Sequence, residues 1–175
     1  MTTFTEDNAT CFVYTFKEGV LSRVAHDLKL QVKQFEIRWQ EGEVMATFDP
    51  QSIVMCEAMK NGRESPGVLS GPDKRKVIEN MHRDVLKTAR FPEIRFAAST
   101  VSATATGVDV DGYLELVGRK RPVSVQAVRG AATWEIEVWV NQPDFGIKPF
   151  KALMGAIKVK PKVKLILTLP IEASA

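Results

Sequence analysis

The sequence predicts an all-β protein, an antiparallel β-barrel with one inserted α-helix. Apolar and polar residues alternate along most of the chain, turn dipeptides separate the alternating runs, and only residues 70–90 show a strong helical pattern. A parallel α/β fold would instead alternate strands with helices throughout. The runs number roughly eight to ten, which favours a barrel or sandwich, and an eight-stranded barrel has an interior that holds side chains or one small ligand.

Four runs show the period-two alternation most clearly. Trp139 is an exception, since it lies on the polar face of its run. The apolar positions are Val44, Ala46 and Phe48; Ile94, Phe96 and Ala98; Trp134, Ile136, Val138 and Val140; and Val163, Leu165, Leu167 and Leu169. Each run is expected to turn these residues into the barrel.

Turn chemistry and phase predict where the strands are interrupted. Glu41-Gly42 and Asp111-Gly112 are expected to form tight hairpins. A bend is expected at Lys33 or Gln34, because the apolar phase changes there by one residue and a bend or bulge must absorb the shift. The two phases are Leu28, Leu30 and Val32, followed by Phe35, Ile37 and Trp39.

The predicted helix begins at a capping box formed by Ser70 and Asp73, with Pro72 in the first turn. It ends before Pro92, because a residue that precedes proline disfavours helical geometry. Its apolar face consists of Val77, Ile78, Met81 and Val85. Residues 20–25 and 150–156 are each expected to form a short helical turn.

Composition is that of one ordinary globular domain. The chain has 175 residues, a formal net charge of +3 and a pI near 8.9, which is only mildly basic. No secretory signal is visible at the N-terminus and no apolar run is long enough to span a membrane, so a cytoplasmic location is expected, or a periplasmic one if a leader was removed. Cys11 and Cys56 are expected to be buried, reduced thiols, with one disulfide as the alternative.

Catalytic and metal chemistry have weak support in the sequence. His26 and Asp27 are adjacent, so on a strand they would point to opposite faces, and His82 lies at the edge of the helix's apolar face. The cysteines and histidines match no metal-ligand spacing, and no nucleophile elbow or phosphate-binding loop is present. We expect no metal site, no cofactor and no catalytic residue.

Two basic clusters have several explanations. Arg119-Lys120-Arg121 is expected in a turn before Pro122, and residues 148–164 contain six lysines without an acid. Either cluster is a solvated surface or a cationic barrel mouth that holds the anionic head of an amphiphile. Nucleic-acid binding is not expected, because the aromatic residues alternate as if facing inward. The outward lysines Lys158, Lys160, Lys162 and Lys164 are expected to form one ridge that docks transiently on an anionic membrane.

Three motifs resemble those of the YceI-like family of lipocalin-like, polyisoprenoid-binding proteins. They are NMH at residues 80–82 with FPEIRF at 91–96, YLELVGRKRPV at 113–123, and NQPDFGI at 141–147. Weaker similarity surrounds residues 19–28 and 48–49. The chain departs from the family pattern in the longer segment 62–83 and in Gln142, where an arginine is common.

The resemblance implies a lipocalin-like, eight-stranded antiparallel barrel over residues 1–175, with a helical insertion at about residues 71–90. Such a barrel encloses a long isoprenoid or acyl chain, often in a homodimer. We therefore expect a protein that binds or carries a polyisoprenoid, quinone-like or acyl lipid and is not an enzyme. The inward apolar residues expected to contact this ligand are Phe35, Ile37, Trp39, Phe48, Phe96, Leu116, Trp134 and Ile136.

Two alternatives remain open at this point. One is an enzyme that acts on an apolar substrate with His26 or His82 as general base, which requires an imidazole at the cavity with a partner in hydrogen-bonding range. The other is a barrel packed solid by its own aromatic side chains, with a structural or interaction role.

Overall fold

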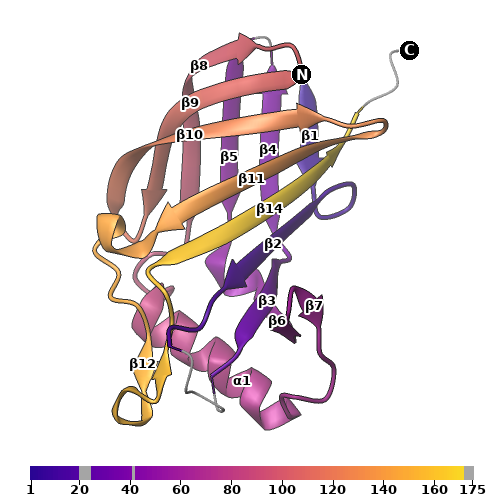
Figure 1. The fold of residues 1–175 in the computed structure, drawn as a ribbon. Helices are drawn as coiled ribbons and strands as arrows, with labels where there is room; N and C mark the ends of the chain where they lie inside the picture. Colours follow the sequence, from indigo (N-terminus) through magenta and orange to yellow (C-terminus); the bar gives the residue numbers. More distant parts are fainter. Residues whose placement is uncertain (20–24, 41, 172–175) are drawn as a thin grey trace.

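One strongly curled antiparallel sheet dominates the computed structural model, which describes residues 1–19, 25–40 and 42–171 (Figure 1). In spatial order its twelve strands are β1 (Thr2–Thr5), β4 (Phe35–Gln40), β5 (Glu43–Phe48), β8 (Ile94–Ala103), β9 (Gly107–Leu116), β10 (Arg119–Arg129), β11 (Thr133–Asn141), β14 (Lys162–Pro170), β2 (Thr10–Thr15), β3 (Asp27–Val32), β6 (Ile53–Lys60) and β7 (Arg63–Glu64). In Figure 1, β9, β10, β11 and β14 cross in front of β4 and β5, so the sheet curls around an interior.

The all-β class and the antiparallel pairing are confirmed, but the count of eight strands is not. The twelve-stranded sheet is a half-barrel whose outer strands are β1 and β7. A separate hairpin consists of β12 (Lys151–Ala152) and β13 (Ile157–Lys158). The number exceeds eight partly because bends divide the chain into shorter strands, as between β3 and β4.

The bend at residues 33–34 is confirmed. Val32 ends β3 and Phe35 begins β4, and both side chains are buried. The amides of Lys33 and Gln34 donate to Ser52 Oγ at 3.2 and 2.8 Å, so the chain turns without losing its hydrogen bonds. Both apolar phases therefore reach the core.

The helix begins as predicted and ends early. α1 spans Gly71–Asn80 and continues into one π-helical turn, η2 (Met81–Val85). Ser70 Oγ accepts from the Asp73 amide at 3.2 Å, while Asp73 accepts from the Ser70 amide at 3.0 Å, which completes the capping box. The chain leaves the helix before Lys87, whose φ of 50° is left-handed, rather than at residue 90.

Short 3-10 turns lie at three connections: η1 (Pro50–Ser52), η3 (Gln142–Phe145) and η4 (Leu153–Gly155). The helical turn expected at residues 150–156 is therefore mainly a β-hairpin with η4 at its tip. The turn expected at residues 20–25 lies outside the described residues except for Ala25. No described helix is long and apolar enough to cross a membrane.

One predicted hairpin is confirmed and the other is wrong. Gln40 pairs with Glu43 across a turn in which Gly42 has a φ of 76°, while Glu41 lies outside the described residues. Asp111-Gly112 instead lies inside β9. A Cβ on Gly112 would lie 2.4 Å from the Ala97 carbonyl oxygen and 2.6 Å from Cζ of Phe96, so this glycine admits the aromatic ring and does not form a turn.

The turn in this region is Val117-Gly118, where φ is 50° and 69°. The cations Arg119-Lys120-Arg121 therefore begin β10, and their placement in a turn is wrong. Pro122 fits within β10 because this strand pairs with β11 only over Gln126–Arg129 in the described sheet. Beside it, Arg121 Nε donates to the Asp144 carbonyl of η3 at 2.9 Å.

The single outward ridge of lysines is also wrong. Lys158 ends β13, Lys162 begins β14, and Lys160 lies in the connection that Pro161 interrupts. Lys164 is half-buried, with Nζ 5.4 Å from the centre of the Tyr14 ring and 3.9 Å from Glu137 Oε2. Lys162 and Lys164 share one face of β14, but Lys158 lines the larger cavity and Lys160 lies outside the strands, so the four lysines do not form one ridge.

The core fills the curled sheet in two adjoining clusters. The larger is centred on β1, β2, β3, β4 and β14, and the smaller joins β9 and β11 to residues 145–147. Their buried residues are Phe4, Ala9, Cys11, Leu30, Val32, Phe35, Ile37, Ala46, Ile53, Leu167 and Leu169, and then Leu116, Val140, Phe145 and Ile147. Among the described residues, this interior includes two unfilled regions.

Candidate ligand-binding site

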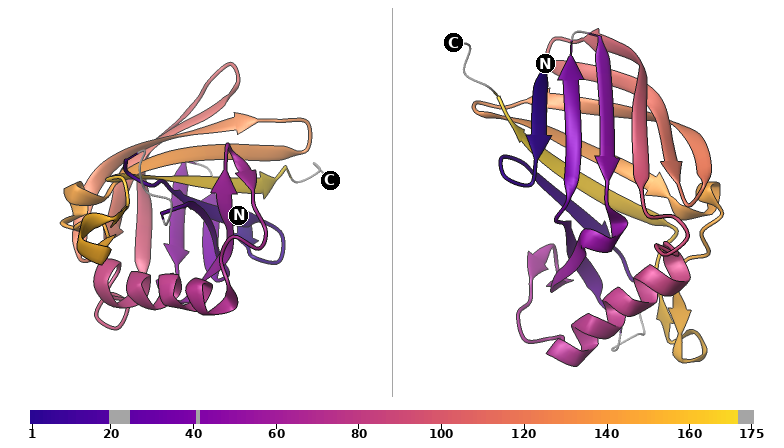
Figure 2. Two further views of the ribbon diagram at one scale, coloured as in Figure 1. Left: turned by 60° about the horizontal axis from the view of Figure 1, so that its bottom comes forward. Right: turned by 180° about the vertical axis from the view of Figure 1, so that it is seen from behind.

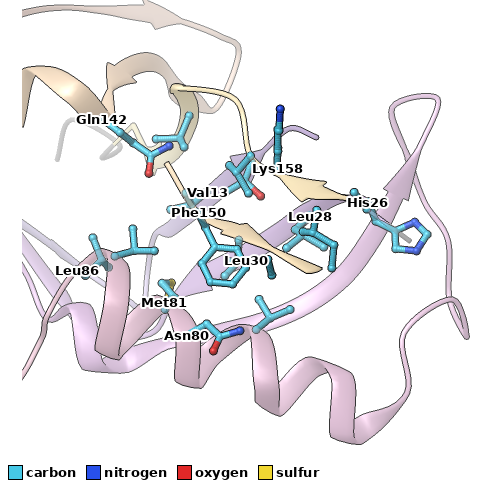
Figure 3. Close-up of a pocket in the computed structure, with 18 of the residues that line it drawn as sticks. Val13, His26, Leu28, Leu30, Asn80, Met81, Leu86, Gln142, Phe150 and Lys158 are labelled. Atoms are coloured by element: carbon cyan, nitrogen blue, oxygen red, sulfur yellow. The ribbon is translucent and has the colours of Figure 1, made fainter. Parts of the chain in front are cut away.

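The larger unfilled region is a cavity of about 460 Å³ at the end of the sheet that α1 covers. Its walls come from β2 and β3, from α1 and η2, and from the β12–β13 hairpin with the segments beside it (Figure 3). The apolar lining residues are Val13, Ala25, Leu28, Leu30, Ile53, Leu69, Val77, Met81, Val85, Leu86, Leu116, Val140, Ile147, Phe150, Ala152, Leu153, Ile157, Val159 and Val163. This volume lies within the range of roughly 300–1,000 Å³ typical of small-molecule sites.

The helix borders the cavity with its apolar face. Both views in Figure 2 show α1 crossing this end of the curled sheet, between the β6–β7 hairpin and the β12–β13 hairpin. Val77, Met81 and Val85 line the cavity, yet no residue of α1 or η2 is fully buried. An amphipathic helix in a filled core would bury this stripe completely. Here Ile78 and Met81 contact the core, while Val77, Met81 and Val85 border unfilled space.

A half-buried ion pair fastens the helix to the sheet. Lys74 Nζ lies 2.6 Å from Glu57 Oε1 and also donates to the Cys56 carbonyl at 2.8 Å. Both side chains are about three-quarters buried, and Glu57 Oε2 is buried without a hydrogen-bond partner in the described part of the chain. This contact ties α1 to β6.

Polar groups lie at the edges of the cavity. Gln142 is buried in its wall, and its Nε2 donates to the carbonyls of Lys160 and Pro161 at 3.1 and 3.2 Å. These bonds hold the chain that leads from the β12–β13 hairpin into β14. The remaining polar lining residues, which include residues of the exposed helix face, are Thr15, His26, Asp73, Lys76, Asn80 and Lys158.

The carboxyl of Asp73 remains charged at the cavity edge. Hydrogen bonds from the side chain and backbone of Ser70 lower the pKa of this carboxyl below its usual value. A bound anion at the mouth would therefore favour Lys76 and Lys158 over the N-terminal end of α1.

The smaller unfilled region is a cavity of about 110 Å³ deeper in the half-barrel. Its lining is wholly apolar: Ile37, Trp39, Val44, Ala46, Phe48, Phe96, Val110, Leu114, Val123, Val125, Ala127, Ile136, Val138, Val140, Leu165, Leu167 and Leu169. Small apolar cavities of about 150 Å³ stay dry and admit molecules as small as benzene. Val140 lines both cavities, so the two are neighbours.

The residues expected to contact ligand divide between these regions. Ile37, Trp39, Phe48, Phe96 and Ile136 line the smaller cavity, and Leu116 lines the larger one. Phe35 and Trp134 line neither of the two. Phe35 stacks on Phe48 with ring centroids 6.0 Å apart, and the ring centroids of Trp134 and Trp39 are 5.8 Å apart, so both pack beside residues that line the smaller cavity.

Most of the larger cavity's lining was missed by sequence reasoning. The sequence predicts the apolar face of the helix, with Val77, Met81 and Val85 on it, but does not place that face at the ligand site. The lining residues Phe150 and Ala152 lie in a segment expected to be helical. Their signal was present in the apolar positions scattered among the lysines of residues 148–164.

The two histidines differ in position. His82 is half-buried on η2, where its Nδ1 lies 3.2 Å from the hydroxyl of buried Thr88. His26 lines the cavity, but Figure 3 shows its imidazole at the edge of the site, directed away from Leu30 and Met81. Within residues 1–19, 25–40 and 42–171, its side chain has no hydrogen-bond partner and no cluster of His, Cys, Asp or Glu could hold a metal ion.

Both cysteines are free thiols. Cys11 is fully buried as expected, and burial raises the pKa of its thiol to about 12. Cys56 is half-exposed, which corrects the expectation that it is buried, because it is the extra residue where the β3–β6 register shifts. Partial burial raises its pKa despite the opposing charge of Lys29.

The YceI-like domain model matches residues 5–171. The chain belongs to the YceI-like family. The match includes every wall of the two cavities described above. No curated protein matches this YceI-like chain.

Several solved structures have the same fold as this YceI-like protein. BcnA of Burkholderia cenocepacia is 14% identical with a TM-score of 0.61, over 93% of this chain and 96% of its own. A polyisoprenoid-binding domain from Saccharophagus degradans, implicated in plant cell wall breakdown, is 12% identical with a TM-score of 0.60, over 98% of each chain. The YceI protein of Campylobacter jejuni is 13% identical with a TM-score of 0.55, over 91% of each.

Proposed function

We propose that this protein binds and carries a long apolar ligand, with the larger cavity as its binding site. The observation that carries the proposal is the apolar face of α1, most of which borders a 460 Å³ cavity while Ile78 packs against the core. A polyisoprenoid, a quinone-like molecule or an acyl lipid has the chemistry to fill it. The similarity to a polyisoprenoid-binding domain supports the isoprenoid among these.

The apolar walls supply enough free energy for useful affinity. Burial of one methylene group contributes about 0.8 kcal/mol, so ten of them contribute about 8 kcal/mol before ordering costs. Burial of further methylene groups would have to offset the ordering costs for the net value to reach about 8 kcal/mol, which corresponds to a Kd on the order of 1 μM. Extension of the chain toward the smaller cavity would add to it.

The ligand is an amphiphile in this proposal. Its tail lies among the apolar side chains, and its polar or anionic head lies at the cavity edge near Lys76, Asn80 and Lys158. Cations at the opening of an apolar site fix the head and the direction of the tail.

The proposal also holds that the protein binds its ligand and does not catalyse a reaction on it. His82 is engaged with Thr88, and the imidazole of His26 is directed away from the site. A homodimer and a cytoplasmic location remain predictions.

The test is to look for a ligand that accompanies the purified protein. Native mass spectrometry and solvent extraction should reveal a lipid-like molecule in stoichiometric amount. Delipidated protein should then take up a polyprenyl phosphate, a quinone or a fatty acid from detergent micelles. Protein that carries nothing and takes up none of the three would contradict the proposal and favour a barrel with a structural or interaction role.

A further inference from the structure

The loop that joins β12 to β13 carries two large apolar side chains into solvent. Met154 has a relative exposure of 108% and Leu153 of 65%. Both belong to η4, at the tip of the hairpin. Single exposed apolar residues are common on protein surfaces, but two adjacent ones at the end of a projecting hairpin form a compact apolar tip.

The backbone of this tip is in a conformation that large side chains disfavour. φ is 49° at Leu153 and 55° at Met154, followed by 90° at Gly155. Asparagine or glycine adopts left-handed geometry with less strain. The turn thus retains two bulky apolar residues where small polar ones would stabilise the fold, which indicates a contact outside the fold.

Cations flank the apolar tip. Residues 145–171 contain six lysines and no Asp or Glu. Lys151 and Lys158 face each other across the hairpin, and exposed Lys148 precedes them. Glu18 lies nearby, with its amide bonded to the Lys158 carbonyl at 2.8 Å, at the base of the hairpin and not at its tip. An apolar tip flanked by lysines has the chemistry of a segment that enters an anionic lipid surface.

The hairpin also borders the opening of the larger cavity. Leu153 and Lys158 line the cavity, while Leu153 remains mostly exposed. The hairpin projects at the same end of the molecule as α1, and the N-terminus lies at the opposite end (Figures 1 and 2). A surface that received the tip would therefore meet the cavity opening.

We infer that the tip formed by Leu153 and Met154 inserts into the surface of an anionic lipid bilayer and holds the cavity opening against it. The purpose of this contact rests on the proposed lipid-carrying function. The contact itself does not, because the tip and its lysines are formed without any ligand.

The experiment is flotation of the full chain with vesicles, either of phosphatidylcholine alone or of equal parts phosphatidylcholine and phosphatidylglycerol. Wild type should float with the anionic vesicles only, and less so at high salt, because added salt shortens the Debye length to about 3 Å at 1 M. Met154→Asp should reduce this binding at least tenfold, and Met154→Trp should strengthen it, because tryptophan favours the interface. The matched control is Met45→Asp on β5, where the methionine is 57% exposed and far from the hairpin in sequence; it should bind as wild type does.

A second variant tests the contribution of the lysines that flank the tip. Lys148→Gln with Lys151→Gln should weaken binding about tenfold or more, since each lysine near an anionic surface contributes about fivefold. Wild-type protein that ignores anionic vesicles, or equal binding by wild type, Met154→Asp and Met45→Asp, would overturn the inference and leave the tip as a contact for another protein.

The vesicle result and the ligand result are separable. Met154 does not line the cavity, so Met154→Asp should take up ligand from detergent micelles as wild type does. Vesicle binding by a protein that takes up no ligand would support the docking tip and refute the carrier. Ligand uptake by a protein that binds no vesicles would do the reverse.

Discussion

Filling the larger cavity from the helix side should abolish most ligand binding without unfolding the protein. Val77 is the position of choice, because it lies on the apolar face of α1, lines the cavity and is only half-buried. A tryptophan in its place would direct its indole into space that is empty in the wild type. Little strain is expected, because Val77 borders the open volume of the cavity.

The size of the effect follows from the space that the indole takes. If it displaces about four methylene groups of the ligand chain, at about 0.8 kcal/mol each, binding weakens by about 3 kcal/mol. That is roughly a 200-fold increase in Kd. Stability should change by less than about 1 kcal/mol, or rise, because the indole buries apolar area that Val77 leaves exposed.

The assay is a titration of delipidated protein with a polyprenyl phosphate or a quinone in detergent micelles, followed by displacement of a fluorescent fatty acid. Val128→Trp is the matched control: Val128 lies on β10, is 43% exposed and lines neither cavity. Its Kd should equal that of the wild type. Equal affinities for wild type, Val77→Trp and Val128→Trp would refute the assignment of the ligand to this cavity.

Three further predictions concern the packing around the site. Lys74→Met removes the partner of Glu57 and should lower the free energy of unfolding by about 1–3 kcal/mol in urea melts. In the control, Lys76→Met, the lost partner is exposed Glu79, 3.7 Å from Lys76 Nζ, and the free energy of unfolding should fall by less than about 0.5 kcal/mol. Equal losses in the two variants would disprove a special role for Lys74. Leu169→Ala should cost about 4 kcal/mol, because Leu169 is 1% exposed and its truncation enlarges the smaller cavity, while Val128→Ala should have little effect. Cys56 should react with a thiol reagent at pH 8 and Cys11 should not. Because burial raises the pKa of Cys11 from 9.0 to about 12, the stability that its neutral thiol provides is complete below pH 9 and is lost as pH rises toward 12; alkaline unfolding that Cys11→Ala leaves unchanged would contradict this.

The sequence predicts those features of the fold that depend on residues close together in the chain. The capping box of Ser70 and Asp73, the bend at residues 33–34 and the turn at Gly42 all result from neighbouring residues, and all are confirmed. Asp111-Gly112 failed because the role of Gly112 is set by Phe96 on the adjacent strand. Val117 in a left-handed turn could not be predicted, since valine is among the residues least suited to that geometry.

The site was predicted in part for a related reason. Period-two alternation identifies the side chains that face the interior, and five of the eight named residues do surround the smaller cavity. Alternation does not say where the interior is left empty. That depends on how α1 and the β12–β13 hairpin, which border the larger cavity, pack against the sheet, and no local pattern encodes this packing.

Because α1 is incompletely buried, a ligand bound in the larger cavity would become part of the protein's own core. A ligand that fills the space beneath the helix would complete packing that the chain leaves unfinished, so occupancy and thermal stability become one measurable quantity. At a free ligand concentration of 100 times Kd the gain is about 2.7 kcal/mol, or roughly 5–10 °C in Tm for a domain of this size. Loss of the ligand would loosen the packing of α1, and the melting temperature would show whether the site is occupied.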